Sequence, residues 1–542
     1  TRLTTTGKAT AAAISPDGKY VTHAMGRAGQ QSLWLRHIPT GSDKEIVPTA
    51  PVRYGALTFS PDGNYIYVLR YENSPEGKLY RVPLLGDSIQ KLASDVDVGI
   101  TCSPDGRHIA YMRGYPERNE ARLITANADG ANEQTLLTKH QADVFPSPSR
   151  AWGPAWSPDG ERIAFALRKD EPDGKYWNVM TVRVEDHAEQ QVTFQKWSEL
   201  GQLAWLSDGS GLIVTASDEE SDPAQQIWHI SYLKGDVRRI TNDTNDYSGV
   251  ILTADSTALV TLRIEQRSNI WMSPGGDASR AAQITSNNVD GESGISWTPE
   301  GRIVYTTRAR GSSDIWIMNE DGTGQNRLTV NARDNFSPSV SADGRYIVFA
   351  SNRTGHSCVW RVDIDGSNPK QLSYGIEGRT PEITPDGQWV IYTDAGSGKR
   401  TLWKVSIEGG KPVQLTNYFS RGPAVSPDGK QIVFVFLDEQ ATPKRMRIAI
   451  IPADGGPPAK VFDLPPRRRI CWTSDGQALT YVDTREGVSN LWLQPLDGSP
   501  ARQLTNFTTD RIIAYAWSHD GKRLACARGN QTSDVVLIAA IK

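Results

Sequence analysis

The sequence predicts an all-β fold, a β-propeller of twelve four-stranded blades. A turn motif, SPDG or a close variant, occurs twelve times in the 542 residues, at intervals of 42 to 54 residues. Each interval contains four short strand-like segments, and a period in the forties with four strands is typical of a propeller blade. The two ends of the chain also carry complementary parts of one repeat, which indicates a closed fold.

The turn motif follows the strand that should lie innermost in each blade. It begins at residues 15, 60, 103, 157, 206, 253, 298, 341, 384, 426, 473 and 518. Short stretches rich in small residues precede it, such as GALTF at 55–59, and small residues suit a crowded centre. In the motif, Pro fixes a backbone dihedral, Asp can bond nearby backbone amides and Gly accepts positive φ. Because Asp stands at the same place in eleven of the twelve motifs, we interpret it as a turn residue and not as a metal ligand.

The other three strands follow in a fixed order. The second is apolar or alternating, as in YIYVL (65–69) and YIVFAS (346–351), which is typical of a buried or half-buried strand. The third carries a central Trp, as in DIWIM (314–318), and a DG or GG turn often joins it to the fourth, a QLT-type segment. A large ring at one register in most blades packs one blade face against the next, so we interpret these Trp residues as core and not as ligand-stacking residues.

The two termini share the last repeat. The final unit has a turn at 518–521, a second strand at 522–529 and a third at 534–542, and then stops. TRLTT at residues 1–5 matches the fourth strand of other units, such as RQLTNF. We expect residues 1–5 to pair with 534–542, because this pairing completes the blade and covers a sheet edge whose backbone groups would otherwise be unpaired.

Twelve blades can close as two six-bladed rings or as one twelve-bladed ring. Propellers typically have about four to eight blades, which favours two rings. We expect the first propeller at residues 8–290 and the second at 291–542, completed by the closing strand 1–7. A rival division follows the third blade, where residues 139–153, which contain Pro and Ser, form the longest segment between blades.

Composition argues against two classes of partner. The formal net charge is -3, and no basic excess points to nucleic acid. The longest apolar run, at 535–541, has seven residues, whereas about 20 are needed for a transmembrane helix. We therefore expect no nucleic acid partner and no membrane contact by this segment.

The repeats carry a family resemblance. The pattern W/F-S-P-D-G-K-x-I-A, followed by IW, DG and QLT segments, resembles the TolB-type propeller repeat, a prokaryotic relative of WD40, over essentially the whole chain. The resemblance implies the fold. It implies no activity by itself, because propellers carry many different functions.

Longer stretches resemble a narrower group. RLTTTGKATAAAISPDGKYV (2–21) and RRITNDTNDYSGVILTADS (238–256) are similar to the C-terminal propeller regions of bacterial eukaryotic-like serine/threonine protein kinases. This resemblance implies a bacterial sensor or interaction module with a kinase domain in the parent chain, and the start at Thr1 fits a processed protein or an excised domain. If the parent kinase is membrane-anchored, a periplasmic or extracytoplasmic location is expected.

Catalytic motifs are absent from the sequence. It contains no Gly-rich phosphate loop with VAIK, no HRD or DFG, and no G-x-S-x-G elbow of the kind that propeller-gated peptidases need. The alternatives are a metal-dependent propeller lyase and the accessory propeller of a hydrolase. Because no two of the eight His have the H-x-x-x-H spacing of a metal pair, we expect no metal, no cofactor and no enzymatic activity.

The loops between one blade and the next supply the candidate ligand-binding residues, because they face the axis of a propeller. The charged residues at this channel mouth are Arg53, Arg150, Arg379, Arg421, Arg468 and Arg511 on a basic arc, and Glu199, Asp246, Glu292 and Asp334 on an acidic arc. A polarised mouth of this kind can capture an acidic peptide, glycan or partner loop, since a low-dielectric cleft focuses the field. Alternatively, these charges pair with one another or face water, where each pair contributes only about 0–1 kcal/mol.

These observations favour a non-catalytic propeller with a binding or sensing role. Its expected partner is a protein, peptide or small-molecule ligand at the channel mouth. The sequence predicts no catalytic and no metal-ligating residue.

Overall fold

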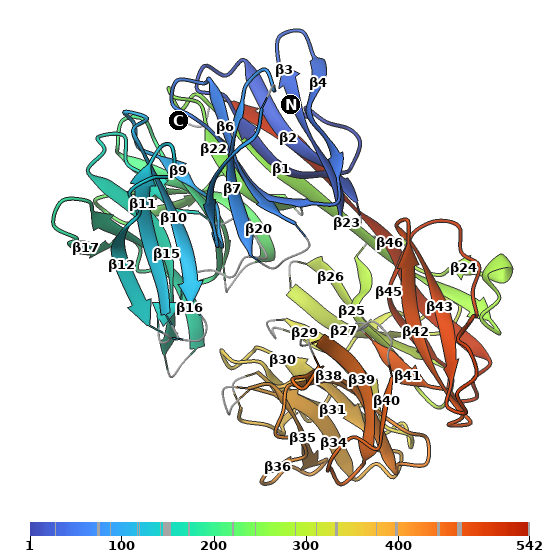
Figure 1. Ribbon diagram of the computed structural model, residues 1–542. Helices are drawn as coiled ribbons and strands as arrows, with labels where there is room; N and C mark the ends of the chain where they lie inside the picture. Colours follow the sequence, from blue (N-terminus) through green and yellow to red (C-terminus); the bar gives the residue numbers. More distant parts are fainter. Residues whose placement is uncertain are drawn as a thin grey trace. The chain divides into compact units, whose positions relative to one another are not determined.

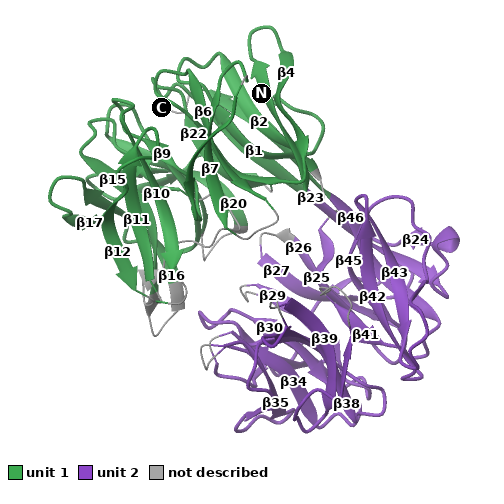
Figure 2. Ribbon diagram, viewed as in Figure 1, with its two compact units in different colours: residues 1–265, 531–542 green, residues 266–530 purple. Residues whose placement is uncertain are grey.

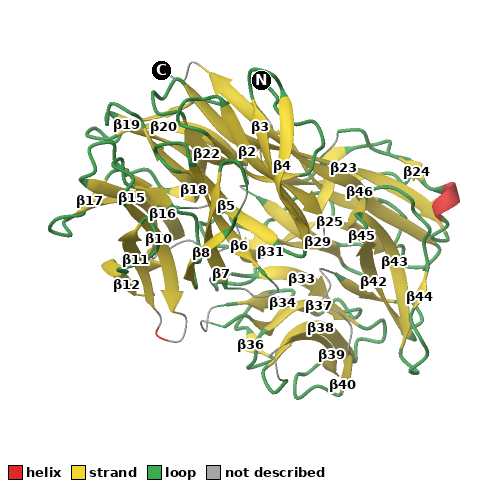
Figure 3. Ribbon diagram, turned by 45° about the horizontal axis from the view of Figure 1, so that its top comes forward, coloured by secondary structure: helices red, strands yellow, loops and turns green. Residues whose placement is uncertain are grey.

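The computed structural model of the protein is all-β (Figure 3). The structure describes residues 1–27, 29–72, 76–86, 88–115, 118, 120–140, 143–144, 153–171, 174–218, 222–243, 245–287, 289–310, 312–330, 334–375, 377–395, 399–441, 445–462 and 469–539. A short 3-10 turn at Ala278–Arg280 interrupts the strands. In the part of the chain that the structure describes, no helix is long and apolar enough to span a bilayer.

Two compact units divide the chain (Figure 2). Unit 1 comprises residues 1–265 and 531–542, and unit 2 comprises residues 266–530. The chain enters unit 2 within strand β23 (Ala258–Pro274) and returns to unit 1 within strand β46 (Arg523–Ala539). Unit 2 is therefore one continuous stretch of chain, whereas unit 1 is built from both ends.

The sheets of unit 1 are antiparallel and follow the order of the repeats (Figure 1). The first three are β1 (Ala9–Ile14), β2 (Tyr20–Arg27), β3 (Gln30–His37) and β4 (Ser42–Ala50); β5 (Arg53–Phe59), β6 (Tyr65–Tyr71), β7 (Gly77–Pro83) and β8 (Gln90–Ser94); and β9 (Thr101–Cys102), β10 (His108–Tyr115), β11 (Glu120–Asn127) and β12 (Gln134–His140). A nine-stranded sheet covers the next two repeats, with β13 (Asp143–Val144), β14 (Ala155–Trp156), β15 (Arg162–Glu171), β16 (Gly174–Arg183), β17 (Glu189–Gln191), β18 (Trp197–Trp205), β19 (Gly211–Asp218), β20 (Asp222–Ser231) and β21 (Val237–Arg239).

Five four-stranded sheets of unit 2 repeat the same plan. They are β25 (Asp290–Trp297), β26 (Ile303–Arg310), β27 (Ser312–Met318) and β28 (Asn326–Arg327); β29 (Asn335–Val340), β30 (Tyr346–Ser351), β31 (Cys358–Asp363) and β32 (Lys370–Gln371); β33 (Arg379–Ile383), β34 (Trp389–Asp394), β35 (Thr401–Ser406) and β36 (Val413–Gln414); β37 (Ser420–Val425), β38 (Gln431–Asp438), β39 (Arg445–Pro452) and β40 (Lys460–Phe462); and β41 (Ile470–Trp472), β42 (Ala478–Arg485), β43 (Val488–Pro495) and β44 (Arg502–Gln503).

The two long strands belong to a sheet in the order β22 (Asp246–Leu252), β23, β46 and β45 (Arg511–Trp517), with β24 (Ala282–Gln283) beside β23. No Gly or Pro lies between Leu259 and Ser273, so nothing in the sequence ends β23 at the unit boundary. Gly529 of β46 allows a close approach, because a Cβ atom at this position would lie only 1.7 Å from the backbone oxygen of Arg267.

Hydrogen bonds within the turn motif explain its sequence. In the first motif, Ser15 Oγ donates to Asp17 Oδ1 at 2.7 Å, and the backbone N–H of Lys19 donates to the same oxygen at 3.0 Å. These bonds lower the pKa of the Asp17 carboxyl, the bond from Ser15 contributing most. Gly18 has a φ of +71°, which favours glycine. The same Ser–Asp bond recurs in the motifs at residues 60 and 103, so the interpretation of the Asp as a turn residue is confirmed for these motifs.

The hydrophobic core lies between neighbouring sheets. One cluster, for example, joins Ile315 and Ile317 of β27 to Ile347 and Phe349 of β30. The Trp of the third strand contributes to these clusters as predicted. Trp228 is 8% exposed and part of a core cluster, and Trp316, Trp360 and Trp403 pack against others.

The two termini pair in unit 1, and the predicted pairing of residues 1–5 with 534–542 is confirmed for residues 1–4 and 534–537; residues 540–542 lie outside the described residues. The backbone N–H of Leu3 donates to Val535 O at 2.8 Å, and that of Leu537 donates to Thr1 O at 2.7 Å. Asp534, which is 2% exposed, forms an ion pair with Arg2 and accepts hydrogen bonds from Thr4 Oγ1 at 2.9 Å and Gly7 N at 3.0 Å.

The unit boundaries differ from the predicted division between residues 290 and 291. The closing strand belongs to unit 1 and not to the second unit, because β46 continues past the point where the sequence predicts a break between two strands. The prediction of an all-β propeller is confirmed. Twelve blades, and two rings as opposed to one, stay predictions.

Candidate functional site

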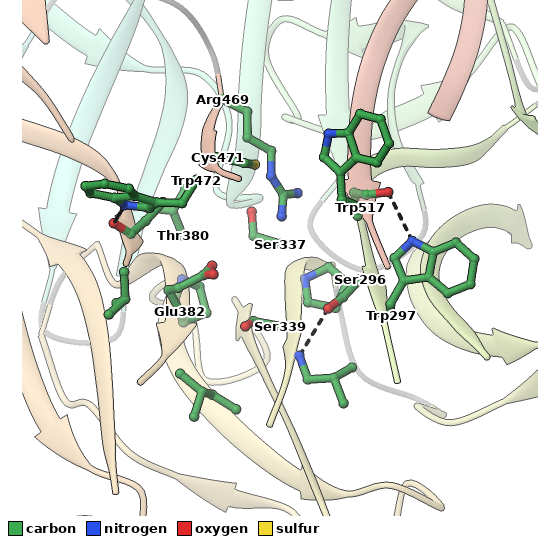
Figure 4. Close-up of a pocket in the computed structure, with 18 of the residues that line it drawn as sticks. Ser296, Trp297, Ser337, Ser339, Thr380, Glu382, Arg469, Cys471, Trp472 and Trp517 are labelled. Carbon is green, nitrogen blue, oxygen red and sulfur yellow. Dashed lines mark hydrogen bonds between the residues drawn. The ribbon is translucent and has the colours of Figure 1, made fainter. Parts of the chain in front are cut away.

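A cavity of about 780 Å³ lies in unit 2, at the innermost strands of its sheets (Figure 4). Residues of β25, β29, β33, β37, β41 and β45 line it. These strands come from every repeat between residues 290 and 517, so the cavity is the common centre of unit 2.

Two sets of lining residues have the same place in every repeat of unit 2. Counted back from the first residue of the turn motif, the second position holds Ser296, Ser339, Glu382, Ala424, Cys471 and Ala516. The fourth position holds Gly294, Ser337, Thr380, Gly422, Arg469 and Ala514. Ten of these twelve side chains are small and uncharged, and the exceptions are Glu382 and Arg469.

Hydrogen bonds between sheets hold the innermost strands in place. Trp297 Nε1 donates to Ala516 O at 3.0 Å, and Trp472 Nε1 donates to Ala424 O at 3.0 Å. The hydroxyl of Ser296 accepts a bond from the backbone N–H of Val340 at 3.2 Å. Of the two charged residues, Glu382 stands on β33 (Arg379–Ile383) and Arg469 directly precedes β41 (Ile470–Trp472).

Glu382 and Arg469 point into the cavity without meeting each other (Figure 4). Among the residues that the structure describes, Glu382 makes no hydrogen bond and no ion pair. Arg469 makes one weak bond, from Nη1 to Ile295 O at 3.5 Å, and contacts the side chain of Cys471. Burial raises the pKa of the Glu382 carboxyl, and the positive charge of Arg469 opposes this shift only in part. The cavity therefore carries two opposite charges that the protein itself leaves unpaired.

Comparisons with known proteins identify the fold of this chain. The model of the PD40 family, described as the TolB beta propeller domain, matches residues 134–311 and 278–463, together more than half of the chain. This chain belongs to the TolB β-propeller family.

Individual relatives of this TolB-type propeller are distant. An uncharacterised protein of Agrobacterium fabrum is 27% identical over 195 residues, which are 34% of this chain and 53% of that protein. Dipeptidyl-peptidase 5 of Arthroderma otae is 27% identical over 203 residues, which are 34% of this chain and 26% of the peptidase. The chain thus spans about half of the first relative and about a quarter of the second. Among solved structures, TolB from Acinetobacter baumannii is similar with 14% identity and a TM-score of 0.33, over 70% of this chain and 84% of that chain.

Two of the charged residues predicted at the channel mouth line the cavity of this TolB-type propeller. They are Glu292 and Arg379. Glu292 forms a long ion pair with Arg308, at 3.8 Å, and the exposed guanidinium of Arg379 lies 5.7 Å from the centre of the Phe336 ring. Of these two lining residues, Glu292 already has an oppositely charged partner, and the polarised mouth stays a prediction.

Other predicted mouth residues are not in the cavity lining. Asp334 Oδ1 accepts a bond from Ser313 N at 3.1 Å, and Asp246 Oδ1 accepts one from Gln225 N at 2.6 Å, so both stabilise loops. Arg53 covers the ring of Tyr71, 3.9 Å from its centre. The exposed Arg511 lies at the start of β45.

The predicted residues are also divided between the units. Glu199 and Arg421 are half-buried, and Glu199 belongs to unit 1 together with Arg53 and Asp246. The predicted residues are therefore divided between the two units, and their role in ligand binding stays a prediction. Arg150 and Arg468 lie outside the described residues.

The sequence prediction missed Glu382 and Arg469 as a pair. The loop positions drew attention to Arg468, whereas the cavity contains the neighbouring Arg469, which belongs to the strand register. The signal that could have identified both is a charge at a position where the other repeats of unit 2 have Gly, Ala, Ser, Thr or Cys.

Within the described residues, no group of three or more His, Cys, Asp or Glu side chains is arranged to hold a metal ion. The four cysteines are free thiols, and Cys471 alone lines the cavity.

Proposed function

We propose that this chain is a non-catalytic binding propeller whose ligand, a protein, peptide or small molecule, occupies the cavity of unit 2. The observation that carries this proposal is the cavity itself, with its unpaired Glu382 and Arg469. Its volume of about 780 Å³ is within the range of roughly 300–1,000 Å³ that is usual for ligand pockets. Glu382 and Arg469 are half-buried, and a half-buried charge without an oppositely charged partner is poorly compensated, so a ligand that supplies the missing partners gains affinity.

The rigidity of the lining supports binding. Side chains on strands that are tied to neighbouring sheets lose little freedom when a ligand arrives, which reduces the entropic cost of association. The hydroxyl of Ser296 is already used by the backbone of β29. The sequence offers no catalytic motif that would use the other hydroxyls for acyl or phosphoryl transfer.

The role in the cell is proposed from the resemblance to kinase-associated propellers. In that setting, unit 2 is the sensing part of a bacterial signalling protein, and ligand binding is reported to a kinase domain of the parent chain. A metal-dependent lyase is the rival function. Stoichiometric divalent metal in the purified chain would favour the lyase.

A bulky residue in the cavity tests the proposed function. Ser339→Trp places an indole in the lining, and Thr58→Trp places one at the same register of unit 1 as a matched control. Random 12-residue peptides displayed on phage are selected against the wild-type chain. We expect the selected peptides to bind Ser339→Trp at least tenfold more weakly, and Thr58→Trp as well as wild type.

Two results would contradict the proposal. One is that the wild-type chain binds neither the displayed peptides nor a mixture of amino acids and short peptides with free ends. The other is that the enriched peptides bind Ser339→Trp unchanged while circular dichroism shows both variants folded.

A further inference from the structure

We infer that the cavity of unit 2 binds a small zwitterion, a free amino acid or a short peptide with free ends, whose ammonium group pairs with Glu382 and whose carboxylate pairs with Arg469. The inference rests on the proposed function, since it names the ligand class of the same cavity. It goes further because it assigns each end of the ligand to one side chain.

The first support is the spacing of the two charges. Glu382 belongs to β33 and Arg469 directly precedes β41, and β37 is the sheet strand between them in the order of the repeats. At the two register positions of the cavity, β37 contributes only Gly422 and Ala424. No large side chain of this strand fills the space between the charges, which leaves room for the atoms that join an ammonium group to a carboxylate.

The second support is that neither charge is satisfied in the described structure. The carboxylate of Glu382 has no hydrogen-bond or ion-pair partner among the described residues, although Arg469 is close enough to act on its pKa. The guanidinium of Arg469 has five N–H donors; one donates to Ile295 O at 3.5 Å, and the thiol of Cys471 is a second contact, so most of the donors have no carboxylate or carbonyl partner among the described residues. Both groups point toward the centre of the cavity (Figure 4).

The third support is discrimination among ligand charges. A simple anion at Arg469 would be repelled by Glu382, and a simple cation at Glu382 would be repelled by Arg469, since fields are strong in a low-dielectric cavity. A zwitterion meets an opposite charge at each end. The planar guanidinium also fits a carboxylate with two parallel hydrogen bonds.

Neutral groups complete the site. The lining hydroxyls of Ser337, Ser339 and Thr380 can donate to or accept from the amide groups of a short peptide. The rings of Trp297 and Trp472 give the cavity apolar wall area. A ligand with charged ends and an uncharged middle therefore matches the lining better than the acidic peptide that the sequence suggests for the mouth.

The experiment combines three ligand libraries with four variants of the full chain. The libraries are mixed tripeptides with free ends, the same tripeptides with an acetylated amino end, and the same tripeptides with an amidated carboxyl end. Each library is equilibrated by dialysis with the protein, and mass spectrometry quantifies the retained peptides. The variants are Glu382→Gln and Arg469→Gln, with Glu439→Gln and Arg485→Gln as controls that remove exposed charges of unit 2 outside the cavity lining.

We expect wild type and both controls to retain free-ended tripeptides, with retention reduced at least tenfold by blocking either end. Glu382→Gln should lose the preference for a free amino end and keep the preference for a free carboxyl end. Arg469→Gln should show the reverse. This crossed pattern is a coupling between one ligand group and one side chain, which a general loss of folding does not produce.

Other results overturn the inference. If wild type retains blocked tripeptides as well as free ones, or retains none, the zwitterion assignment is wrong. The same holds if both cavity variants keep both preferences. The displayed 12-residue peptides then decide separately whether the cavity binds any ligand, so a failure of the inference is distinguishable from a failure of the proposed function.

Discussion

Units 1 and 2 share a common frame of repeated antiparallel sheets, and they differ in the side chains of their innermost strands. At the second position before the turn motif, unit 1 has Ala13, Thr58, Thr101, Ala155, Ala204 and Ile251. At the fourth position it has Ala11, Ala56, Gly99, Gly153, Gln202 and Gly249. None of these twelve residues is charged, whereas the same positions of unit 2 include Glu382 and Arg469.

The bonds that hold the frame are common to both units. Thr101 Oγ1 of unit 1 accepts from Trp156 N at 3.0 Å, as Ser296 Oγ of unit 2 accepts from Val340 N at 3.2 Å. Trp205 Nε1 donates to Ala155 O at 3.1 Å, as Trp297 does to Ala516 in unit 2. The comparison teaches that repeated residues build the fold, and that residues which break the repeat are the candidates for function.

The largest change in stability is expected at the contact between the two chain ends, because unit 1 is built from both ends of the chain and unit 2 is one continuous segment. The carboxylate of Asp534 accepts hydrogen bonds from Arg2, Thr4 and Gly7, and these bonds join the two ends of the chain within unit 1. Asp534→Ala removes this acceptor. We expect unit 1 to lose about 3 kcal/mol of stability, because several bonds to a charged acceptor disappear together. Hydrogen exchange should accelerate in β22 and β46 and stay unchanged in β29 to β40.

Asp497→Ala is the control for this change, since Asp497 is an exposed turn residue whose carboxylate accepts one backbone bond, from Ser499 N. If Asp534→Ala accelerated hydrogen exchange equally in both units, the contact between the chain ends would not stabilise unit 1 alone, and the prediction would be wrong.

A smaller loss of stability, equal in the two units, is expected when the Trp-to-carbonyl hydrogen bond that both units contain is removed. Trp297→Phe and Trp205→Phe each remove one indole N–H and leave a buried backbone carbonyl without its donor. Each change should lower the free energy of unfolding of its own unit by about 1–2 kcal/mol. Urea unfolding followed by hydrogen exchange in each unit measures both.

Trp34→Phe serves as the reference, because its indole bonds only to Ser32 of the same strand, at 2.9 Å, and its loss should cost less. If only one of Trp297→Phe and Trp205→Phe lowered the free energy of unfolding of its unit, the two hydrogen bonds would not have the same role in the two units.

The smallest effect is a pH dependence of the stability of unit 2 that depends on Glu382. Because burial holds the pKa of Glu382 above its usual range, the folded chain retains a proton there that the unfolded chain has released. The stability of unit 2 therefore falls as pH rises from the ordinary glutamate range through the raised pKa. Glu382→Gln should remove this fall, so the variant gains relative to wild type as pH rises.

Urea midpoints for unit 2 between about pH 4 and pH 8 measure this difference. Unit 1 has no carboxyl group at the equivalent positions, where for example Gln202 stands. Parallel pH profiles for wild type and Glu382→Gln would refute the burial of an ionisable carboxyl in the cavity.

The sequence predicts much of the fold, because turn chemistry and strand periodicity are local. The SPDG turns, the Trp positions and the pairing of the two ends follow from short motifs. The long strands β23 and β46 do not, since a strand that continues through a unit boundary has the same local pattern as two shorter strands. The boundary at residue 265 was therefore missed.

The candidate site was predicted less well than the fold. Loop charges such as Asp334 and Asp246 resemble ligand-binding residues in sequence, yet they accept bonds from backbone N–H groups. Glu382 and Arg469 are separated by 86 intervening residues, and only the closed arrangement of the sheets brings their strands to one cavity.

Because β23 and β46 cross the boundary between the units, they also determine the order in which the two units can be completed during synthesis. Residues 266–530 are contiguous, so unit 2 can complete every one of its sheets while the chain is still attached to the ribosome. Unit 1 is synthesised first but has to wait for residues 531–539, and until they emerge β22 and the first half of β23 have an uncovered edge. Of the two units, the one that contains residues 1–265 is therefore the one whose last sheet is completed later.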